Sequence, residues 1–281
     1  MSDKIKQLLI LARLNKPIGI YLLLWPTVWG LWLAGKGQPD WFIVAIFMLG
    51  VVLTRSAGCI INDIADCKKD GFVERTRSRP LVTKKVSIKE ALLFFILLMI
   101  SAFILVCFTN QLTMLLAVFG AFIAMGYPFL KRLTHLPQLG LGVAFSWSIP
   151  MAFAAMTDSI PAEGWLLFAT AVFWPIIYDT QYAMTDREDD VQIGIKSTAI
   201  LFGQWDRGMI GLLQVIFLLL LCWVGYVFQL NHLYYMNLLL VAVLFGYQQW
   251  LIKDRLPQPC FKAFLNNNWV GCLVFLGMVL G

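Results

Sequence analysis

Long apolar stretches recur along the chain at a spacing of about 30 residues, the length of a bilayer-crossing helix of roughly 20 residues plus a loop. Short segments rich in charged residues separate them. This pattern predicts an all-α, polytopic membrane protein whose single domain, residues 1–281, is a bundle of nine transmembrane helices. We expect the spans at about 18–34, 41–61, 91–108, 112–130, 139–157, 164–182, 208–228, 233–252 and 268–281.

The composition agrees with lipid as the solvent for most of the surface. Hydrophobic residues make up 60% of the 281 positions, whereas soluble domains contain about 45–50%. Charged residues make up only 14%. Too few polar side chains remain to cover a water-facing surface, so a water-soluble globular fold is excluded.

Basic residues indicate how the spans are oriented. Of the 22 Lys and Arg residues, all but Lys36 and Arg55 lie in the N-terminal segment or in loops on the same side of the predicted bundle. Because Lys and Arg concentrate on the cytoplasmic side of membrane proteins, we expect the N-terminus and the large loops in the cytoplasm. The net charge of +6 then reflects topology and attraction to membrane lipid, and it requires no nucleic-acid partner.

Acidic residues are concentrated at the cytoplasmic ends of two spans. The second span is followed by Asp63, Asp66, Asp70 and Glu74, and the sixth ends with Asp179, Asp186, Glu188, Asp189 and Asp190. A solvated loop face is the plain interpretation of one such run. The spacing argues against it, because Asn62, Asp66 and Asp70 fall on one helix face. In the second run, Asp179, Asp186 and Asp190 also share a face.

Carboxylates four residues apart on a helix repel one another, so a cation must compensate them. If the second and sixth helices are neighbours, their carboxylates form an oxygen-rich site that suits Mg²⁺, with phosphate oxygens of a substrate completing the coordination. Such a site would polarise a diphosphate leaving group. The apolar helices beside it favour a substrate with a long hydrocarbon tail, and they would shield an allylic cation from water.

Basic residues gather at the same membrane boundary, and topology alone explains most of them. Arg55 is different, because a cation inside a span is costly unless it is paired or faces a polar cavity. It lies seven residues before Asn62 on the same helix face, so we expect it in the site. The other basic candidates are Arg75, Lys131, Arg132 and Lys196.

Over essentially its whole length the chain resembles the UbiA superfamily of intramembrane prenyltransferases. The two Asp motifs, RSAGCIINDIAD at 55–66 and YDTQYAMTDREDDVQIGIKSTAI at 178–200, are typical of that superfamily. Two shorter stretches, THLPQ at 134–138 and YDTQYAM at 178–184, resemble its 4-hydroxybenzoate branch in ubiquinone biosynthesis.

The resemblance implies a nine-helix bundle of the UbiA type in a bacterial inner membrane. We infer no obligate protein partner. It also implies a Mg²⁺ cofactor, held by Asn62, Asp66, Asp70, Asp186 and Asp190. The diphosphate of the prenyl substrate would be bound by Arg132, and we group with it Lys131, Lys196, Arg75 and Tyr127.

The implied reaction transfers a polyprenyl group from polyprenyl diphosphate to the ring carbon ortho to the hydroxyl of 4-hydroxybenzoate. We expect Arg55 to meet the carboxylate of this aromatic acid, with Asn62 and Arg13 nearby. We expect Asp63 or Asp179 to help remove the ring proton. The candidate catalytic residues are therefore Asp63, Asp66, Asp70, Asp179, Asp186 and Asp190.

Two alternatives stay open at this point. An enzyme of the same fold could prenylate another acceptor, dihydroxynaphthoate or haem. From a different class, the acids could serve a divalent-cation transporter, although transporters place ion sites near the middle of the membrane and these acids lie at its edge.

Overall fold

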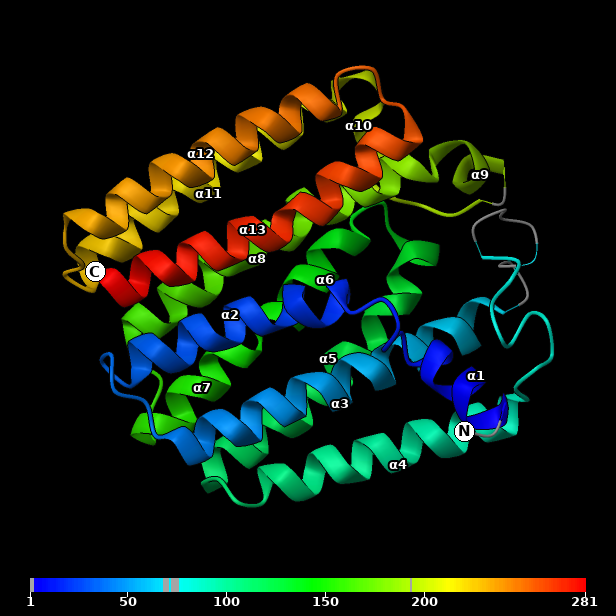
Figure 1. The fold of residues 1–281 in the computed structure, drawn as a ribbon, viewed down its shortest axis with the longest axis horizontal. Coiled ribbons are helices and arrows are strands. Elements are labelled where there is room, and N and C mark those ends of the chain that lie inside the picture. The colour runs from blue at the N-terminus through cyan, green and yellow to red at the C-terminus, as the bar shows by residue number, and fades with distance from the viewer. Residues whose placement is uncertain (1–2, 68–70, 72–75, 193) are drawn as a thin grey trace.

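The computed structural model of the protein describes residues 3–67, 71, 76–192 and 194–281. Long helices run side by side between two ends of the molecule, and the described residues contain no β-strand (Figure 1), which confirms the all-α prediction. The α-helices are α1 Asp3–Leu11, α2 Ile18–Ala34, α3 Trp41–Asp66, α4 Ile88–Val106, α5 Gln111–Leu133, α6 Pro137–Ser146, α7 Ser148–Thr157, α8 Ala162–Thr185, α9 Arg187–Gln192, α10 Thr198–Phe202, α11 Asp206–Val227, α12 His232–Leu251 and α13 Pro257–Leu280.

Each of the nine predicted spans overlaps a helix, and the span at 139–157 overlaps the consecutive pair α6 and α7. Within the described residues, six stretches are long and apolar enough to cross a membrane: α3, α4, α5, α6–α7, the α10–α11 stretch and α13. A further apolar helix, α2, is only 17 residues long. The multi-span prediction is therefore supported, whereas the count of nine stays a prediction.

Helices α8 and α12 contribute to a buried amide network. The side-chain oxygen of Gln248 in α12 accepts from Gln181 of α8 at 3.0 Å and from Gln214 of α11 at 3.1 Å. Asn267 of α13 donates in turn to Gln181 at 2.8 Å. In lipid, polar side chains are tolerated where they bond across helices in this way. The network thus joins four helices.

The last helix begins earlier than the sequence pattern indicates. The prediction starts at 268, whereas α13 begins at Pro257 and has 24 residues. Proline is well suited to the first turn of a helix, where its missing N–H is not needed. The polar run Asn266–Asn268 resembles a loop in sequence, but its side chains bond to neighbouring helices within the bundle.

A row of indoles joins the helix α2 to the helix α13. The N–H groups of Trp25, Trp29 and Trp32 donate to oxygens of α13 at 2.9, 3.2 and 3.0 Å. The close approach requires Gly271, because a Cβ there would lie only 2.3 Å from a ring atom of Trp25. Helix α2, near the N-terminus, is therefore packed closely against α13 at the C-terminus.

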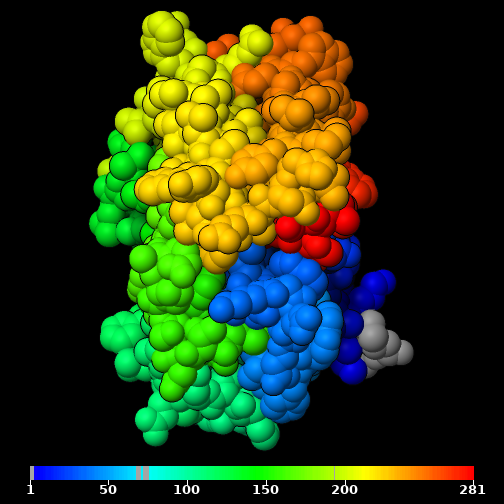
Figure 2. Space-filling model, turned by 90° about the vertical axis from the view of Figure 1, so that its left-hand side faces the viewer, coloured from blue at the N-terminus to red at the C-terminus, as the bar shows by residue number. Residues whose placement is uncertain are grey.

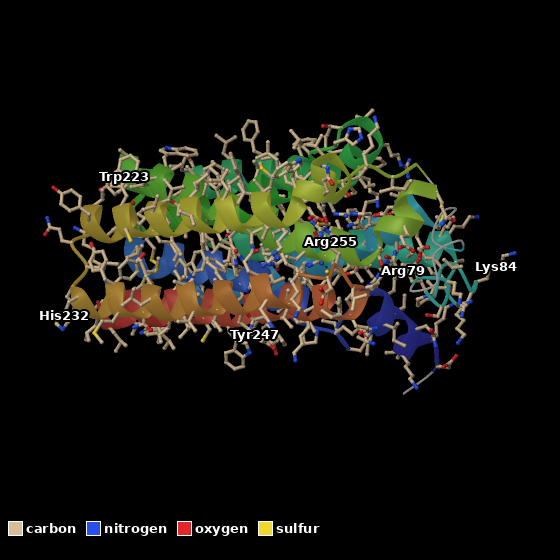
Figure 3. The ribbon with its side chains drawn as sticks, turned by 90° about the horizontal axis from the view of Figure 1, so that it is seen from above. Arg79, Lys84, Trp223, His232, Tyr247 and Arg255 are labelled. Carbon is tan, nitrogen blue, oxygen red and sulfur yellow. The ribbon has the colours of Figure 1, made fainter. Side chains whose placement is uncertain are left out.

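Charged segments lie at one end of the helices. In Figure 3, Arg79 and Lys84 lie at that end and Trp223 and His232 at the other, and Figure 1 places α1 and α9 with the first pair. Figure 2 views the opposite end, where the C-terminus and the links between α2 and α3 and between α11 and α12 lie side by side. Successive loops therefore lie at alternate ends of the bundle, as expected for helices that cross a membrane one after another.

The basic end should face the cytoplasm. In a variant without the native cysteines, Ser159→Cys, at the weakly charged end, should react in intact cells with a membrane-impermeant thiol reagent. Ser78→Cys should react only after the cells are opened, although both positions are exposed. Labelling of Ser78→Cys in intact cells would reverse the orientation.

Candidate functional site

A cavity of about 560 Å³ lies at the charged end of the bundle. Residues of α2, α3, α5, α6, α8 and α13 line it, together with the segments that link α1 to α2 and α9 to α10. The acidic ends of α3 and α8 both reach it. Its acidic lining residues are Asp63, Asp66, Asp179, Asp186 and Asp190. The structure thus brings the two acidic runs of the sequence to one space.

Asp66, at the end of α3, is compensated by the end of α5. Lys131 donates from Nζ to Oδ2 of Asp66, and an Arg132 nitrogen lies 3.7 Å from Oδ1. The Asp66 side chain is 9% exposed, and its Oδ1 has no hydrogen-bond partner among the described residues. One turn earlier, Asn62 donates to the hydroxyl of Tyr127 at 2.9 Å. A lysine and an arginine of α5 therefore compensate the charge of Asp66.

Lys131 and Arg132 differ in what they face. Lys131 lines the cavity, whereas Arg132 is not among its lining residues in the described part of the chain. The Arg132 side chain is 41% exposed and donates to the carbonyl of Ala65 at 2.5 Å. Lys196 also lines the cavity, and its backbone N–H donates to the carbonyl of Lys131 at 3.0 Å. Of the predicted diphosphate contacts, these two lysines and Tyr127 face the cavity.

Asp63 is held by two arginines. Its Oδ1 lies 2.9 Å from Nη2 of Arg13 and 3.0 Å from Nη1 of Arg79, and its side chain is 2% exposed. A buried carboxylate needs such partners because desolvation penalises its charge. The pair ties α3 to the segments on either side of it in the sequence. The two ion pairs give Asp63 and Arg13 a structural role, although both residues also line the cavity and Oδ2 of Asp63 has no hydrogen-bond partner among the described residues.

Arg55 lies deeper, within α3, and borders the cavity. Its guanidinium stacks over the ring of Phe145 with 5.5 Å between the guanidinium carbon and the ring centroid. It packs against the backbone of α2 at Gly19, where a Cβ would lie 2.5 Å from Nε. That Nε is buried and has no hydrogen-bond partner among the described residues. A cation with an unused donor, beside a cavity, is suited to an anionic ligand.

Tyr178 is a cavity residue that the sequence reasoning did not single out. It is 1% exposed, and its hydroxyl has no hydrogen-bond partner within the described ranges. Its ring packs edge-on against Trp174 and Phe264. Its position next to Asp179 in the YDTQYAM motif is the signal that could have identified it, because a tyrosine hydroxyl buried in an apolar helix usually bonds to something.

A second, mostly apolar cavity of about 350 Å³ lies between α3, α4, α5 and α7. Arg55, Tyr127 and Phe145 line both cavities, so the two spaces meet at these side chains. The combined space is therefore polar at the membrane boundary and apolar inside the bundle. That shape suits an amphiphile with a charged head.

The acidic residues can bind a Mg²⁺ ion only if water or a bound substrate completes its coordination. Among the described residues, no three His, Cys, Asp or Glu side chains form a metal-binding group by themselves. However, Mg²⁺ commonly takes only one or two carboxylates and fills its other positions with water and substrate phosphates. The buried, unsatisfied oxygen of Asp66 offers such a ligand. Two predicted residues, Asp70 and Arg75, lie outside the described residues.

Comparison with known proteins adds a family and a fold. The model of the UbiA prenyltransferase family matches residues 23–275. A 4-hydroxybenzoate octaprenyltransferase of Coxiella burnetii is 56% identical over 280 residues, which are 100% of this chain and 98% of the relative.

Two solved structures share the helical fold. An apo UbiA homologue from Aeropyrum pernix K1 has a TM-score of 0.82 at 24% identity, covering 93% of this chain and 97% of that one. A UbiA homologue from Archaeoglobus fulgidus, bound to GPP and Mg²⁺, has a TM-score of 0.72 at 18% identity, covering 98% and 99%. The expected fold type is therefore confirmed.

If Asp63 is structural, its replacement should lower stability. In Asp63→Asn, Arg13 and Arg79 lose a charged partner, and breaking a buried ion pair costs about 3–5 kcal/mol. The thermal unfolding midpoint of the detergent-solubilised protein should fall clearly. The control is Asp254→Asn, which makes the same chemical change at an exposed pair with Lys253 and should change the midpoint little. Equal midpoints for the two variants would contradict the assignment.

Proposed function

The chain belongs to the UbiA prenyltransferase family, and from this premise we propose that it transfers a polyprenyl group from polyprenyl diphosphate to 4-hydroxybenzoate. The new bond forms at the ring carbon ortho to the hydroxyl, and diphosphate leaves. The observation that carries the proposal is the pair of joined cavities, one polar with acids and lysines and one apolar, which meet at Arg55. The name of the Coxiella burnetii relative supports the acceptor.

The polar cavity holds the diphosphate head in this proposal. Asp66, Asp186 and Asp190 would hold Mg²⁺ together with the diphosphate, and Mg²⁺ when bound neutralises charge on the leaving group. Lys131 and Lys196 line the same space and supply further positive charge. The Mg²⁺ and GPP bound to the Archaeoglobus fulgidus homologue support this arrangement. Arg132, which lies off the cavity, has a secondary role.

The apolar cavity receives the first part of the hydrocarbon tail. Its lining residues come mainly from α3, α4 and α5, three helices that are long and apolar enough to cross a membrane. A tail longer than the cavity can therefore continue toward the membrane. Because water is excluded there, the allylic cation formed when diphosphate departs is protected from hydrolysis.

The aromatic acid is placed where the two cavities meet. Arg55 offers a buried cation with an unpartnered Nε to its carboxylate, and Tyr178 offers an unpartnered hydroxyl. Asp179 also lines this space and is our candidate to accept the ring proton, because Oδ1 of Asp63 already bonds to two arginines and only its buried Oδ2 has no partner among the described residues. The enzyme would act at the cytoplasmic boundary of a bacterial inner membrane, in ubiquinone biosynthesis.

Product analysis tests the proposed reaction. Purified protein with Mg²⁺ and farnesyl diphosphate should convert 4-hydroxybenzoate to its ortho-prenylated product, as identified by mass spectrometry and NMR. Chelation with EDTA should stop the reaction, and Asp66→Ala and Asp186→Ala should each reduce the rate more than tenfold, a barrier increase above about 1.4 kcal/mol. Prenylation of dihydroxynaphthoate or haem, with 4-hydroxybenzoate unused, would overturn the acceptor assignment.

Kinetic constants should distinguish the residues that contact the aromatic acid from those that contact the diphosphate. Arg55→Gln should raise KM chiefly for 4-hydroxybenzoate, because it removes a charge-assisted hydrogen bond, which contributes about 1.5–3 kcal/mol or roughly ten- to a hundredfold. Lys131→Met should instead impair use of prenyl diphosphate. The matched control is Arg132→Gln at the adjacent position, which should have a smaller effect than Lys131→Met. An unchanged KM for 4-hydroxybenzoate in Arg55→Gln would exclude this role.

A further inference from the structure

A cluster of three charged residues lies beside the described cavities without lining them. At its centre is Asp206, the first residue of α11, which is fully buried. Its Oδ1 accepts from Nε of Arg255 at 2.9 Å, and its Oδ2 accepts from Nη2 of Arg187. None of the three is among the cavity-lining residues of the described chain. Figure 3 shows Arg255 toward the end of the molecule that carries Arg79.

The two arginines also bond to two backbone carbonyls outside the cluster. Arg187 also donates to the carbonyl of Ala199 in α10 at 2.8 Å. Arg255, in the link between α12 and α13, also donates to the carbonyl of Gln204 at 2.7 Å. A carboxylate at the centre of such a network is costly to bury unless its partners stay in place. The cluster therefore connects α9, α10, α11 and the α12–α13 link at the charged end.

The short helix α9, Arg187–Gln192, is joined to the bundle through this connection. None of its described side chains is buried, so apolar packing does not hold it. Its first residue, Arg187, enters the cluster, while the residue before it, Asp186, lines the polar cavity. Asp190 follows within the same helix, with its N–H bonded to the carbonyl of Asp186 at 2.9 Å. The position of both acids is thus linked to that of Arg187.

We propose that Asp206 is a positioning residue for the second acidic motif. It holds Arg187, and through Arg187 it sets the place of Asp186 and Asp190 at the mouth of the polar cavity. This inference rests on the proposed function, in which those two acids bind Mg²⁺ together with diphosphate. Asp206 itself contacts neither ligand. Its loss should therefore weaken metal and diphosphate binding and leave the acceptor site, around Arg55, unaffected.

Equilibrium binding tests this role without relying on turnover. The full-length protein in detergent is titrated with Mn²⁺ in the presence of inorganic diphosphate, and bound Mn²⁺ is measured by electron paramagnetic resonance. Asp206→Asn should raise the Mn²⁺ concentration for half-saturation about tenfold, equivalent to about 1.4 kcal/mol. In the turnover assay its KM for 4-hydroxybenzoate should stay at the wild-type value.

Two further variants complete the experiment. Asp254→Asn, next to Arg255 in the same link, removes only an exposed pair with Lys253 and should bind Mn²⁺ like the wild type. Arg187→Lys keeps the charge opposite Asp206, but its single ammonium cannot reproduce the planar guanidinium contacts with Asp206 and Ala199. Arg187→Lys should therefore weaken Mn²⁺ binding. If Asp206→Asn fails to fold, this variant alone tests the positioning role.

The outcomes separate this inference from the proposed function. Folded Asp206→Asn or Arg187→Lys protein that melts at a lower temperature but binds Mn²⁺ like the wild type would overturn the positioning role and leave a structural one. Absence of Mn²⁺ binding by the wild-type protein would instead contradict the proposed function. The Mn²⁺ binding of Asp186→Ala shows the effect of losing a metal ligand directly and is the reference for the other variants.

Discussion

Compensation of buried carboxylates at the membrane boundary is the constraint on which the rest of this structure depends. Asp63 and Asp66 lie on the last turns of α3 and are almost fully buried. Such charges persist only with cations in direct contact, because the surrounding medium is a poor solvent for them. Arg13, Arg79 and Lys131 supply the contacts from three other parts of the chain. The ends of α3 and α5 and the segment linking α1 to α2 are thereby drawn together around one polar cavity.

The same charges create a gradient of polarity along the bundle. Acids and lysines line the cavity at its charged end, and farther inside the lining becomes apolar. Arg55, Tyr127 and Phe145 stand at the transition, which is the place where a charged head and a hydrocarbon chain would be joined. The amide network of α8, α11, α12 and α13 and the indole row between α2 and α13 provide a rigid frame around this space. A reaction that must exclude water benefits from such a frame.

Much of this arrangement could be predicted from the sequence, because helix periodicity determines which residues share a face. Hydropathy located the helices, and the spacing of Asn62, Asp66 and Arg55 placed them together. The resemblance pointed to Arg132 as the main diphosphate contact, whereas Lys131 is the residue that lines the cavity. Neighbours on a helix point about 100° apart, and only the packing of α5 decides which one faces the cavity. The start of α13 was also hidden, since Asn267 looks like a loop residue until its partner Gln181 is known. Tyr178 was missed because an aromatic residue in an apolar helix usually serves packing alone.

An experimental structure with Mn²⁺ and a non-hydrolysable farnesyl thiodiphosphate would test the central claim most directly. The anomalous signal of Mn²⁺ both identifies the metal and locates it. The account predicts Mn²⁺ between Asp66 and the pair Asp186 and Asp190, the diphosphate beside Lys131, and the tail extending past Arg55 into the apolar cavity. A metal bound elsewhere in the molecule, or a tail lying along the outer surface of the bundle, would contradict it.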